Sequence, residues 1–300
     1  MSVRKSNWFI KNEQLGKLTV GTEGEATYHL LDDADGTNTR NFADAEGAGV
    51  VMANFLVRVN GVTNGLAWKD ILRGTNNLTP GQGGRRNIVR YDTPVFQGFS
   101  ATASWGEDDI WGGSLTYKGD IGDFKVVGKA GYANNSDIGI QRCNPLSSVD
   151  QDCEWWGLAG TVMHSPTGLY VYGGYGEQKD NTRASNFPKL VGINDTDKVW
   201  FVQAGIEQKF NSLGKTTLFG EFRNDDGGSN PGKALGGAGT FIRDSSIDFW
   251  AAGAVQNIEA AAMDLYVIYR HADGDVTNGK NVTTSLDSFD MVMTGAMIKF

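Results

Sequence analysis

Residues 198–225 read KVWFVQAGIEQKFNSLGKTTLFGEFRND, and this stretch decides the fold class. Apolar side chains occupy every second position of its two arms, as at Trp200, Val202 and Leu218, and polar side chains such as Gln203 and Glu221 lie between them. The NSLG between the arms has the composition of a tight turn. A period of two on both sides of a turn predicts an antiparallel hairpin with one apolar and one polar face.

The same alternation recurs along the chain, for example in DFKVVGKAGYANN (123–135) and AMDLYVIYRHADG (262–274). We therefore expect an all-β protein. The thirteen strands that the pattern predicts are 4–11, 16–23, 87–93, 98–105, 110–118, 123–133, 154–164, 168–177, 198–210, 215–224, 246–256, 262–271 and 290–300.

Polar and apolar residues also alternate in a soluble antiparallel sheet with one solvated face, so this alternation alone does not indicate a membrane barrel. The lengths of the connectors distinguish the two kinds of sheet. Short links such as DIGD, SPTG and NSLG alternate with long polar ones at 134–153, 178–197, 225–245 and 273–288. The connector near Glu107 is an exception, because it is short where the alternation predicts a long one. Short turns at one end and long loops at the other are typical of an outer-membrane β-barrel. Aromatic residues near the strand ends fit the girdles of such a barrel: Trp8, Trp105, Trp111, Tyr117, Tyr132, Trp156, Tyr175, Trp200, Phe210, Phe222, Trp250 and Tyr269.

Composition agrees with many short strands and turns, since the 300 residues include 41 glycines and 11% aromatic residues. The mean hydropathy is −0.33, and no stretch approaches the ~20 apolar residues of a membrane helix. A barrel strand shows only alternate residues to lipid, so this mean does not argue against a membrane. The net charge of −8 argues against a nucleic-acid partner.

Three segments carry a resemblance to a known family. They are NEQLGKLTVGTEGEATYHL (12–30), RRNIVRYDTPVFQGFSATASWG (85–106) and the terminal SFDMVMTGAMIKF (288–300). Their order resembles that of the general trimeric porins of Gram-negative bacteria, in particular alphaproteobacterial ones, with the correspondence strongest at 15–22 and 87–99. Phe300 matches the terminal aromatic that the barrel-insertion machinery of such bacteria reads, whereas Val292 stands where that signal often has a second aromatic.

The resemblance implies a transmembrane antiparallel barrel over residues 1–300, in the outer membrane, that forms a water-filled channel for passive diffusion of small hydrophilic solutes and ions. It implies a homotrimer in contact with membrane lipid and lipopolysaccharide, no cofactor or metal, and no enzymatic activity. Bacterial barrels have even strand numbers, and MSVRKSNWF has no signal-peptide core. We therefore expect a longer precursor, with a signal and about three further strands of a roughly sixteen-stranded porin.

Segment 24–86 is the candidate functional region, because so long a connector is rare in a compact domain unless it has a function. In porins the corresponding third loop folds into the lumen and narrows it. The expected acidic side of the constriction is Asp32, Asp33, Asp35, Asp44 and Glu46. The expected basic side is Arg58, Arg73, Arg85 and Arg86 on the segment and Arg90, Lys125, Lys129 and Arg270 on the wall, where Lys11, Lys209 and Arg223 also face inward. Opposed charges would set a transverse field across the pore.

Other readings stay open. DDADGTN (32–38) shares the Asp-x-Asp-Gly pattern of a calcium-binding loop but lacks the distal glutamate, so a plain turn is the simpler interpretation. The histidines His29, His164 and His271 lie far apart, and no catalytic motif occurs. The rival functions are an outer-membrane hydrolase, for which His271 and Asp273 form the one candidate rim pair, and a soluble carbohydrate-binding β-domain.

The two cysteines, Cys143 and Cys153, flank NPLSSVDQD in a predicted external loop, and in an exported protein we expect them to form one disulfide. Closing a loop of this size contributes about 2–3 kcal/mol in the chain-entropy model. Replacing Cys143 with Ser should raise the protease sensitivity of the loop more than it alters conductance. Two free thiols, found by mass spectrometry in protein isolated from the outer membrane, would contradict the prediction.

Overall fold

The computed structural model describes residues 4–42, 52–72, 79–107, 109–136, 152–235 and 240–298. Nearly all regular structure in these ranges is antiparallel strand. None of their helices is long and apolar enough to cross a membrane. The strands of the main sheet are β1 (Ser6–Asn12), β2 (Gly16–Gly24), β5 (Arg85–Asp92), β6 (Phe99–Gly106), β7 (Trp111–Ile121), β8 (Phe124–Asn135), β9 (Cys153–His164), β10 (Leu169–Asp180), β11 (Thr196–Asn211), β12 (Gly214–Gly227), β13 (Ile242–Ile258), β14 (Met263–Asn278), β15 (Thr283–Ser285) and β16 (Phe289–Ile298).

The thirteen predicted strands are confirmed, with ends that differ by up to seven residues, and each pairs with its neighbour along the chain. The short β15 and the longer β16 both pair with β14. The prediction that segment 24–86 lacks strands is wrong. It holds the hairpin β3 (Leu56–Val59) and β4 (Val62–Ala67) and the short helices η1 (Asp32–Ala34) and α2 (Trp68–Ile71). Asn60 and Gly61 join the hairpin with positive φ, a two-residue turn that the sequence VNGV signals.

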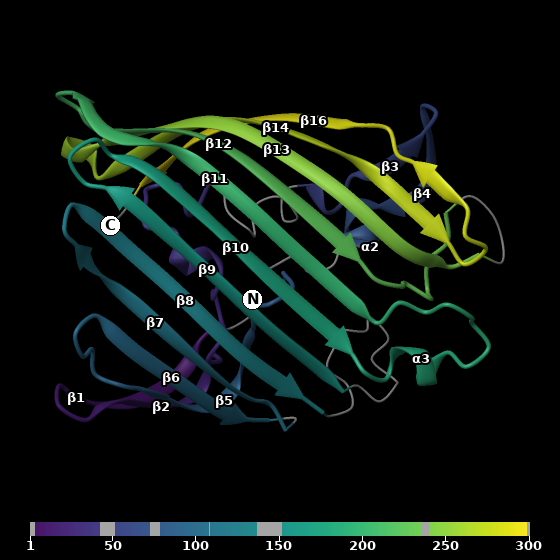
Figure 1. Cartoon of the computed structure of the whole chain (residues 1–300), viewed down its shortest axis with the longest axis horizontal. Helices are drawn as coiled ribbons and strands as arrows, with labels where there is room; N and C mark the ends of the chain where they lie inside the picture. The colour runs from purple at the N-terminus through teal and green to yellow at the C-terminus, as the bar shows by residue number, and fades with distance from the viewer. Residues whose placement is uncertain are drawn as a thin grey trace.

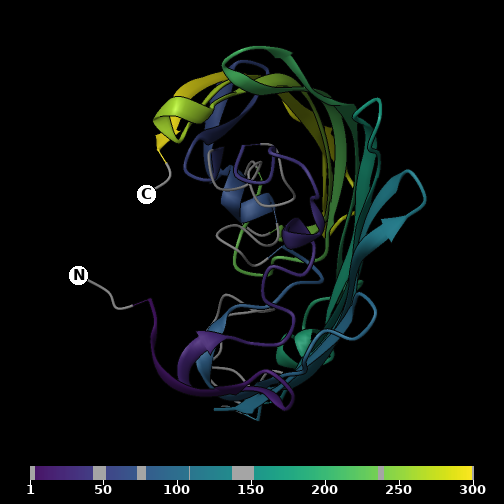
Figure 2. The ribbon, with the colours of Figure 1, turned by 90° about the vertical axis from the view of Figure 1, so that its left-hand side faces the viewer.

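The sheet curls around the described parts of segment 25–84, residues 25–42, 52–72 and 79–84 (Figure 2). Within the described residues β1 pairs with β2 alone and β16 with β14 alone. One end of the sheet carries the short turns and is called the turn end below. The other carries the long connectors, with α3 (Arg183–Asn186) among them, and is called the loop end (Figure 1). The predicted alternation of connector lengths is therefore confirmed.

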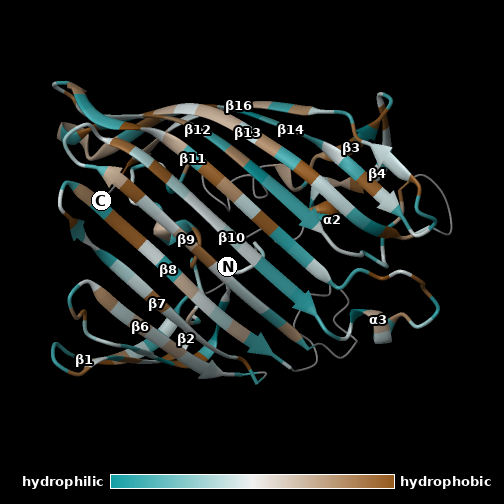
Figure 3. Cartoon of the chain, in the orientation of Figure 1, coloured by the Kyte–Doolittle hydropathy of each residue, from teal (hydrophilic) through white to brown (hydrophobic). Residues whose placement is uncertain are grey.

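Hydrophilic and hydrophobic residues alternate along the strands (Figure 3), and large apolar side chains such as Leu158, Val202 and Leu218 are exposed. Trp200 and Trp250 are 44% and 46% exposed, whereas the adjacent Phe201 and Phe249 are 3% and 1% exposed, so alternate residues face outward and inward. Eight successive strands each place one aromatic ring in an outward belt. Its touching pairs are Trp111–Tyr132, Trp156–Tyr175, Trp200–Phe222 and Trp250–Tyr269, with ring centroids 5.1–5.5 Å apart. Such belts lie at the membrane interface.

Two apolar clusters fix segment 25–84 against the concave face of β9–β14. In the first, Leu31 and Phe42 pack against wall residues such as Phe201 and Phe219. In the second, Trp68 and Ile71 of α2 pack with wall residues that include Phe249. Full burial of a side chain of this size stabilises the fold by about 1.5–3 kcal/mol. The inner surface of this half of the sheet is therefore a packed core.

Inward glycines let the returning part of the segment lie directly on the wall. A Cβ at Gly176 of β10 would lie 1.9 Å from the carbonyl oxygen of Pro80, and one at Gly157 of β9 would lie 2.7 Å from that of Gly81. Both approaches are to backbone atoms, which no side-chain rotation can relieve. Gly157 and Gly176 are therefore a seat for residues 80 and 81.

Replacing Gly176 with Ala should move residues 80 and 81 off the wall and destabilise the barrel by about 1–3 kcal/mol, the usual cost of overpacking. The midpoint of the heat-induced shift in detergent-gel migration measures this. The matched control is Gly128→Ala on the lipid face of β8, where a Cβ meets nothing within 4 Å. Equal midpoints for the two variants would contradict the assignment of Gly176 as a seat.

Candidate pore constriction

Wall side chains bind the first part of the segment through its backbone and hydroxyl groups. Trp155 of β9 donates its indole N–H to Oγ1 of Thr27 at 2.7 Å, and that hydroxyl donates to the buried carboxylate of Glu25 at 2.6 Å. The Tyr172 hydroxyl of β10 donates to the carbonyl oxygen of Leu31 at 2.8 Å. Buried donors and acceptors that find partners in this way avoid a desolvation cost of about 1–3 kcal/mol each.

The next stretch of the segment, residues 34–39, is held by β9 and β11. The Thr161 hydroxyl donates to the carbonyl oxygen of Ala34 at 2.7 Å and accepts from the amide of Gly36 at 3.0 Å. Gln203 donates to Oγ1 of Thr39 at 2.7 Å. The segment is thus fixed at successive points along its backbone, which sets the position of the acidic residues between them.

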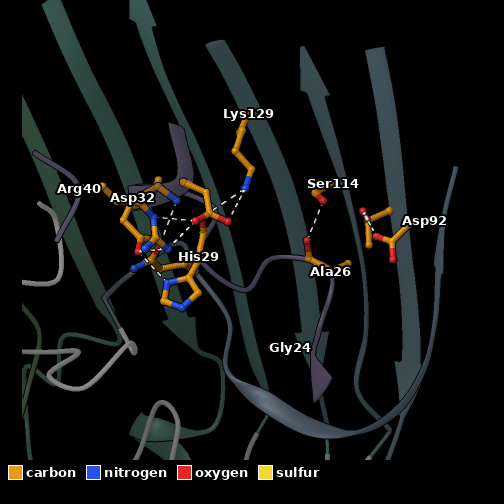
Figure 4. Close-up of polar contacts among 12 residues, drawn as sticks. Gly24, Ala26, His29, Asp32, Arg40, Asp92, Ser114 and Lys129 are labelled. Carbon is orange, nitrogen blue, oxygen red and sulfur yellow. Dashed lines mark hydrogen bonds and ion pairs between the residues drawn. The ribbon is translucent and has the colours of Figure 1, made fainter. Parts of the chain in front are cut away.

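Asp32 and Asp33 enter a mixed ion cluster, of which Figure 4 labels His29, Asp32, Arg40 and Lys129. Arg40 lies 3.2 Å from Asp32 and 2.5 Å from Asp33, and His29 Nδ1 lies 2.7 Å from Asp32. Lys129 reaches from β8 to Asp33 at 3.3 Å and also donates to the carbonyl oxygen of His29. Asp32 is buried, whereas the Asp33 side chain is 42% exposed. Asp33 therefore carries the accessible negative charge of the cluster.

Asp35 has a different environment from Asp32 and Asp33. Its carboxylate accepts hydrogen bonds from the Thr37 amide at 2.8 Å and from the hydroxyls of Thr37 and Thr39 at 2.7 and 2.6 Å. Burial raises the pKa of Asp35, and these hydrogen bonds oppose that rise. Its carboxylate closes the turn at DDADGTN, as the simpler interpretation of that motif expects.

The structure brings one predicted wall cation, Lys129, to the acidic residues, and it places the others elsewhere. Arg90 pairs with Asp92 of its own strand at 2.7 Å and donates to the Gly24 carbonyl oxygen. Arg270 is buried, with Nη2 3.5 Å from Glu221. Three more predicted cations lie outside the cluster: Arg58 exposed on β3, Arg85 with its guanidinium 4.6 Å from the Tyr28 ring centroid, and Arg86 beside it. Lys125 is exposed on β8.

Asp44, Glu46, Arg73, Cys143 and Phe300 lie outside the described residues, so their predicted roles stay predictions. Cys153 is buried at the start of β9 and is disulfide-bonded. Its pairing with Cys143 stays a prediction as well. In the described part of the chain no group of three or more His, Cys, Asp or Glu side chains is arranged to hold a metal ion.

Two polar cavities lie along the concave face of β1–β8, opposite the packed half of the sheet. The first, of about 490 Å³, runs beside β2 and β5–β8 and is lined by Lys17, Arg90 and Ser114 among others. The second, of about 670 Å³, extends to the turn end of β7 and β8. Thr116, Lys129 and Asp33 line both cavities, so the Asp33–Lys129 ion pair borders each of them.

Sequence reasoning missed the uncharged side chains that place the segment: Trp155, Thr161, Tyr172, Gln203 and the glycines 157 and 176. The signal for them is their inward position in the alternating pattern, where a hydroxyl, amide, indole or glycine is open to a partner from another part of the chain.

A curved antiparallel sheet with a lipid-facing apolar surface, an aromatic belt and a charged inner face defines an outer-membrane β-barrel channel. The family profile described as Gram-negative porin matches residues 1–287, and the chain belongs to that family. It is an outer-membrane porin, a barrel through which small hydrophilic solutes diffuse passively. Family and fold indicate a channel rather than an enzyme.

Solved structures share the fold at low sequence identity. The anion-selective porin from Comamonas acidovorans matches with a TM-score of 0.59 and 16% identity, over 98% of this chain and 76% of that one. The OmpF complex with daunomycin from Salmonella typhi matches with a TM-score of 0.53 and 14% identity, over 99% and 78%. The trimer form of OmpT from Vibrio cholerae matches with a TM-score of 0.53 and 14% identity, over 98% and 79%. Among curated protein sequences there is no match.

Replacing Thr161 with Val keeps the side-chain shape but removes both hydrogen bonds to residues 34 and 36. We expect a loss of about 1–3 kcal/mol, because two backbone groups lose their partner. Hydrogen exchange at the amide of Gly36 should accelerate. The control is Thr294→Val on the exposed face of β16, where the hydroxyl donates to the Tyr266 carbonyl oxygen. Exchange at Gly36 as slow as in the wild type would contradict the anchoring role of Thr161.

Proposed function

We propose that solutes cross this porin between segment 25–42 and the inner face of β1–β8, and that the Asp33–Lys129 ion pair is the narrow point of that path. The observation that carries the proposal is the position of this pair on the shared lining of the two polar cavities. On the opposite side, Leu31 and Phe42 pack against apolar residues of β9–β14.

The charges along this path favour small hydrophilic solutes. Hydroxyls of Ser100, Ser114 and Thr116 and the charges of Arg90 and Lys129 line the first cavity. Solutes that carry dipoles or charges exchange water for these groups at little cost, whereas apolar solutes gain nothing from them. The predicted field between opposed acids and bases is weaker than an unpaired arrangement would give, because Arg40 and Lys129 already neutralise Asp33 at short range.

We further propose that the protein acts as a homotrimer without enzymatic activity. The trimer form of OmpT, which shares the fold, supports the assembly. The hydrolase alternative finds little support at His271, whose Nδ1 lies 2.7 Å from Asp290 and whose Nε2 lies 3.3 Å from Asp273. With a carboxylate at both ring nitrogens and its ring stacked on outward Trp250, His271 has no free nitrogen to activate a nucleophile.

Charge-neutral substitutions of the ion pair test the path. Asp33→Asn leaves the positive charges of Lys129 and Arg40 at the narrow point, so the permeability ratio of K⁺ to Cl⁻ should fall. Lys129→Gln should raise that ratio, and the double variant should lie between. Reversal potentials across planar bilayers measure these ratios. The effects should be largest near 0.01 M salt, where the Debye length is about 30 Å, and small near 1 M, where it is about 3 Å.

The matched control is Asp248→Asn, which removes the same charge on the outward face of β13, where Asp248 accepts a hydrogen bond from Asn224. It should leave selectivity unchanged. If Asp33→Asn and Lys129→Gln also leave it unchanged in dilute salt, the ion pair lies outside the conduction path and the proposal is wrong.

A further inference from the structure

Four lysines gather at the turn end of the inner face of β1, β2, β7 and β8: Lys11, Lys17, Lys118 and Lys125, called the turn-end lysines below. They occupy inward positions, in step with the lumen-facing Thr19 and Thr116 of the same sheet. Lys17 lines the first polar cavity, and Lys118 and Lys125 line the second. Lys11 lies directly opposite Lys17 in the pairing of β1 with β2.

These lysines have no ion pair with a carboxylate of the described residues, unlike the inner-wall cations Arg90, Lys129 and Lys215. Arg90 pairs with Asp92, Lys129 with Asp33, and Lys215 with Glu207 at 2.7 Å. Carboxylates also line these cavities: Glu23 and Asp33 lie in the first with Lys17, and Asp33 and Asp35 lie in the second with Lys118 and Lys125. Glu23 and Asp33 have cation partners of their own, Lys5 and Lys129, and Asp35 accepts hydrogen bonds from Thr37 and Thr39. Asp92 is already held by Arg90 and Thr102, Asp120 lies opposite Lys125 in the register, and Glu13 and Asp123 lie in the adjoining turns.

The arrangement costs stability. Like charges directly opposite each other on neighbouring strands destabilise a sheet, and Lys11 and Lys17 are such a pair. Lys17 is also held in place, because its Nζ lies 4.7 Å from the centroid of the Phe9 ring, a cation–π contact. Proteins keep locally unfavourable arrangements, such as two facing lysines, mainly where the residues have a function. The support that Phe9 gives to Lys17 is consistent with such a role.

We infer that the turn-end lysines form an anion-collecting mouth of the conduction path, which favours entry of small anions from the turn end. This inference rests on the path proposed above and goes beyond it by assigning a charge preference and a direction. Cations grouped in a channel of low-dielectric walls raise the local concentration of anions and lower that of cations. The net charge of the whole chain, −8, has the opposite sign, so the preference comes from placement and not from composition.

The test is the variant Lys11→Gln/Lys17→Gln/Lys118→Gln/Lys125→Gln of the full chain, in planar bilayers with KCl as the probe. Each kT of potential that the variant removes should lower the Cl⁻ to K⁺ permeability ratio about sevenfold, because the two ions respond in opposite directions. The loss should be greatest near 0.01 M salt and vanish toward 1 M. Current that drives Cl⁻ in from the turn end should fall more than current in the other direction, since all four lysines lie at one end.

Two controls make the result specific. The variant with arginine at all four positions keeps the charge and should keep the wild-type ratio, and Lys280→Gln in the connector at the loop end should leave the turn-end asymmetry unchanged. Heat-modifiable gel migration shows whether each variant folds, and if the fourfold variant does not fold, Lys118→Gln/Lys125→Gln should give a smaller loss of the same sign.

If the folded glutamine variant has the wild-type Cl⁻ to K⁺ permeability ratio, the inference is wrong. It is also wrong if the arginine variant lowers that ratio as much as the glutamine variant does. Either result leaves the path itself intact if Asp33→Asn still changes selectivity. A wild-type chain that forms no channel overturns the path and this inference together.

Discussion

The hydrogen-bonding needs of the peptide backbone in lipid constrain the whole structure. Hydrocarbon offers no partner for an N–H or C=O group, so each strand must pair with a neighbour along its length. The ladders from β2 to β14 meet this need with an antiparallel neighbour on each side, whereas in the described residues β1 and β16 each pair along one edge. Strand geometry then alternates the side chains between two environments. One set must be apolar because it meets lipid, and the other is free to be polar.

Because the inward side chains do not have to be apolar, the two halves of the inner wall have different side chains and different roles. Along β9–β14 apolar side chains and glycines accept the packed segment, with Phe201 and Gly176 as examples. Along β1–β8 lysines, arginines and hydroxyls remain in contact with the polar cavities. A segment that is packed on one side and bordered by polar cavities on the other is the proposed constriction.

In the described part of the chain, several deeply buried charges inside the lumen form ion pairs. Arg223 and Asp225 form a 2.6 Å ion pair at 2% and 3% exposure. A buried charge without a partner costs several kcal/mol, whereas one in contact with water is tolerated at little cost. This difference explains why unpaired lysines occur at the open turn end. It also explains why the candidate constriction is an ion pair, Asp33–Lys129, and not a row of bare carboxylates.

The amino-acid sequence by itself determined the strands, their order and the side that meets lipid. Each depends on a period of two and on turn residues within a few positions, as in residues 198–225. It also marked the segment and its acidic residues. Only the tertiary structure decided which partner each charge has. Asp33 meets Lys129 across 96 positions, and Arg270 meets Glu221 across 49. Such pairs depend on how the curled wall carries distant strands to one side of the segment, and no local pattern encodes that curvature.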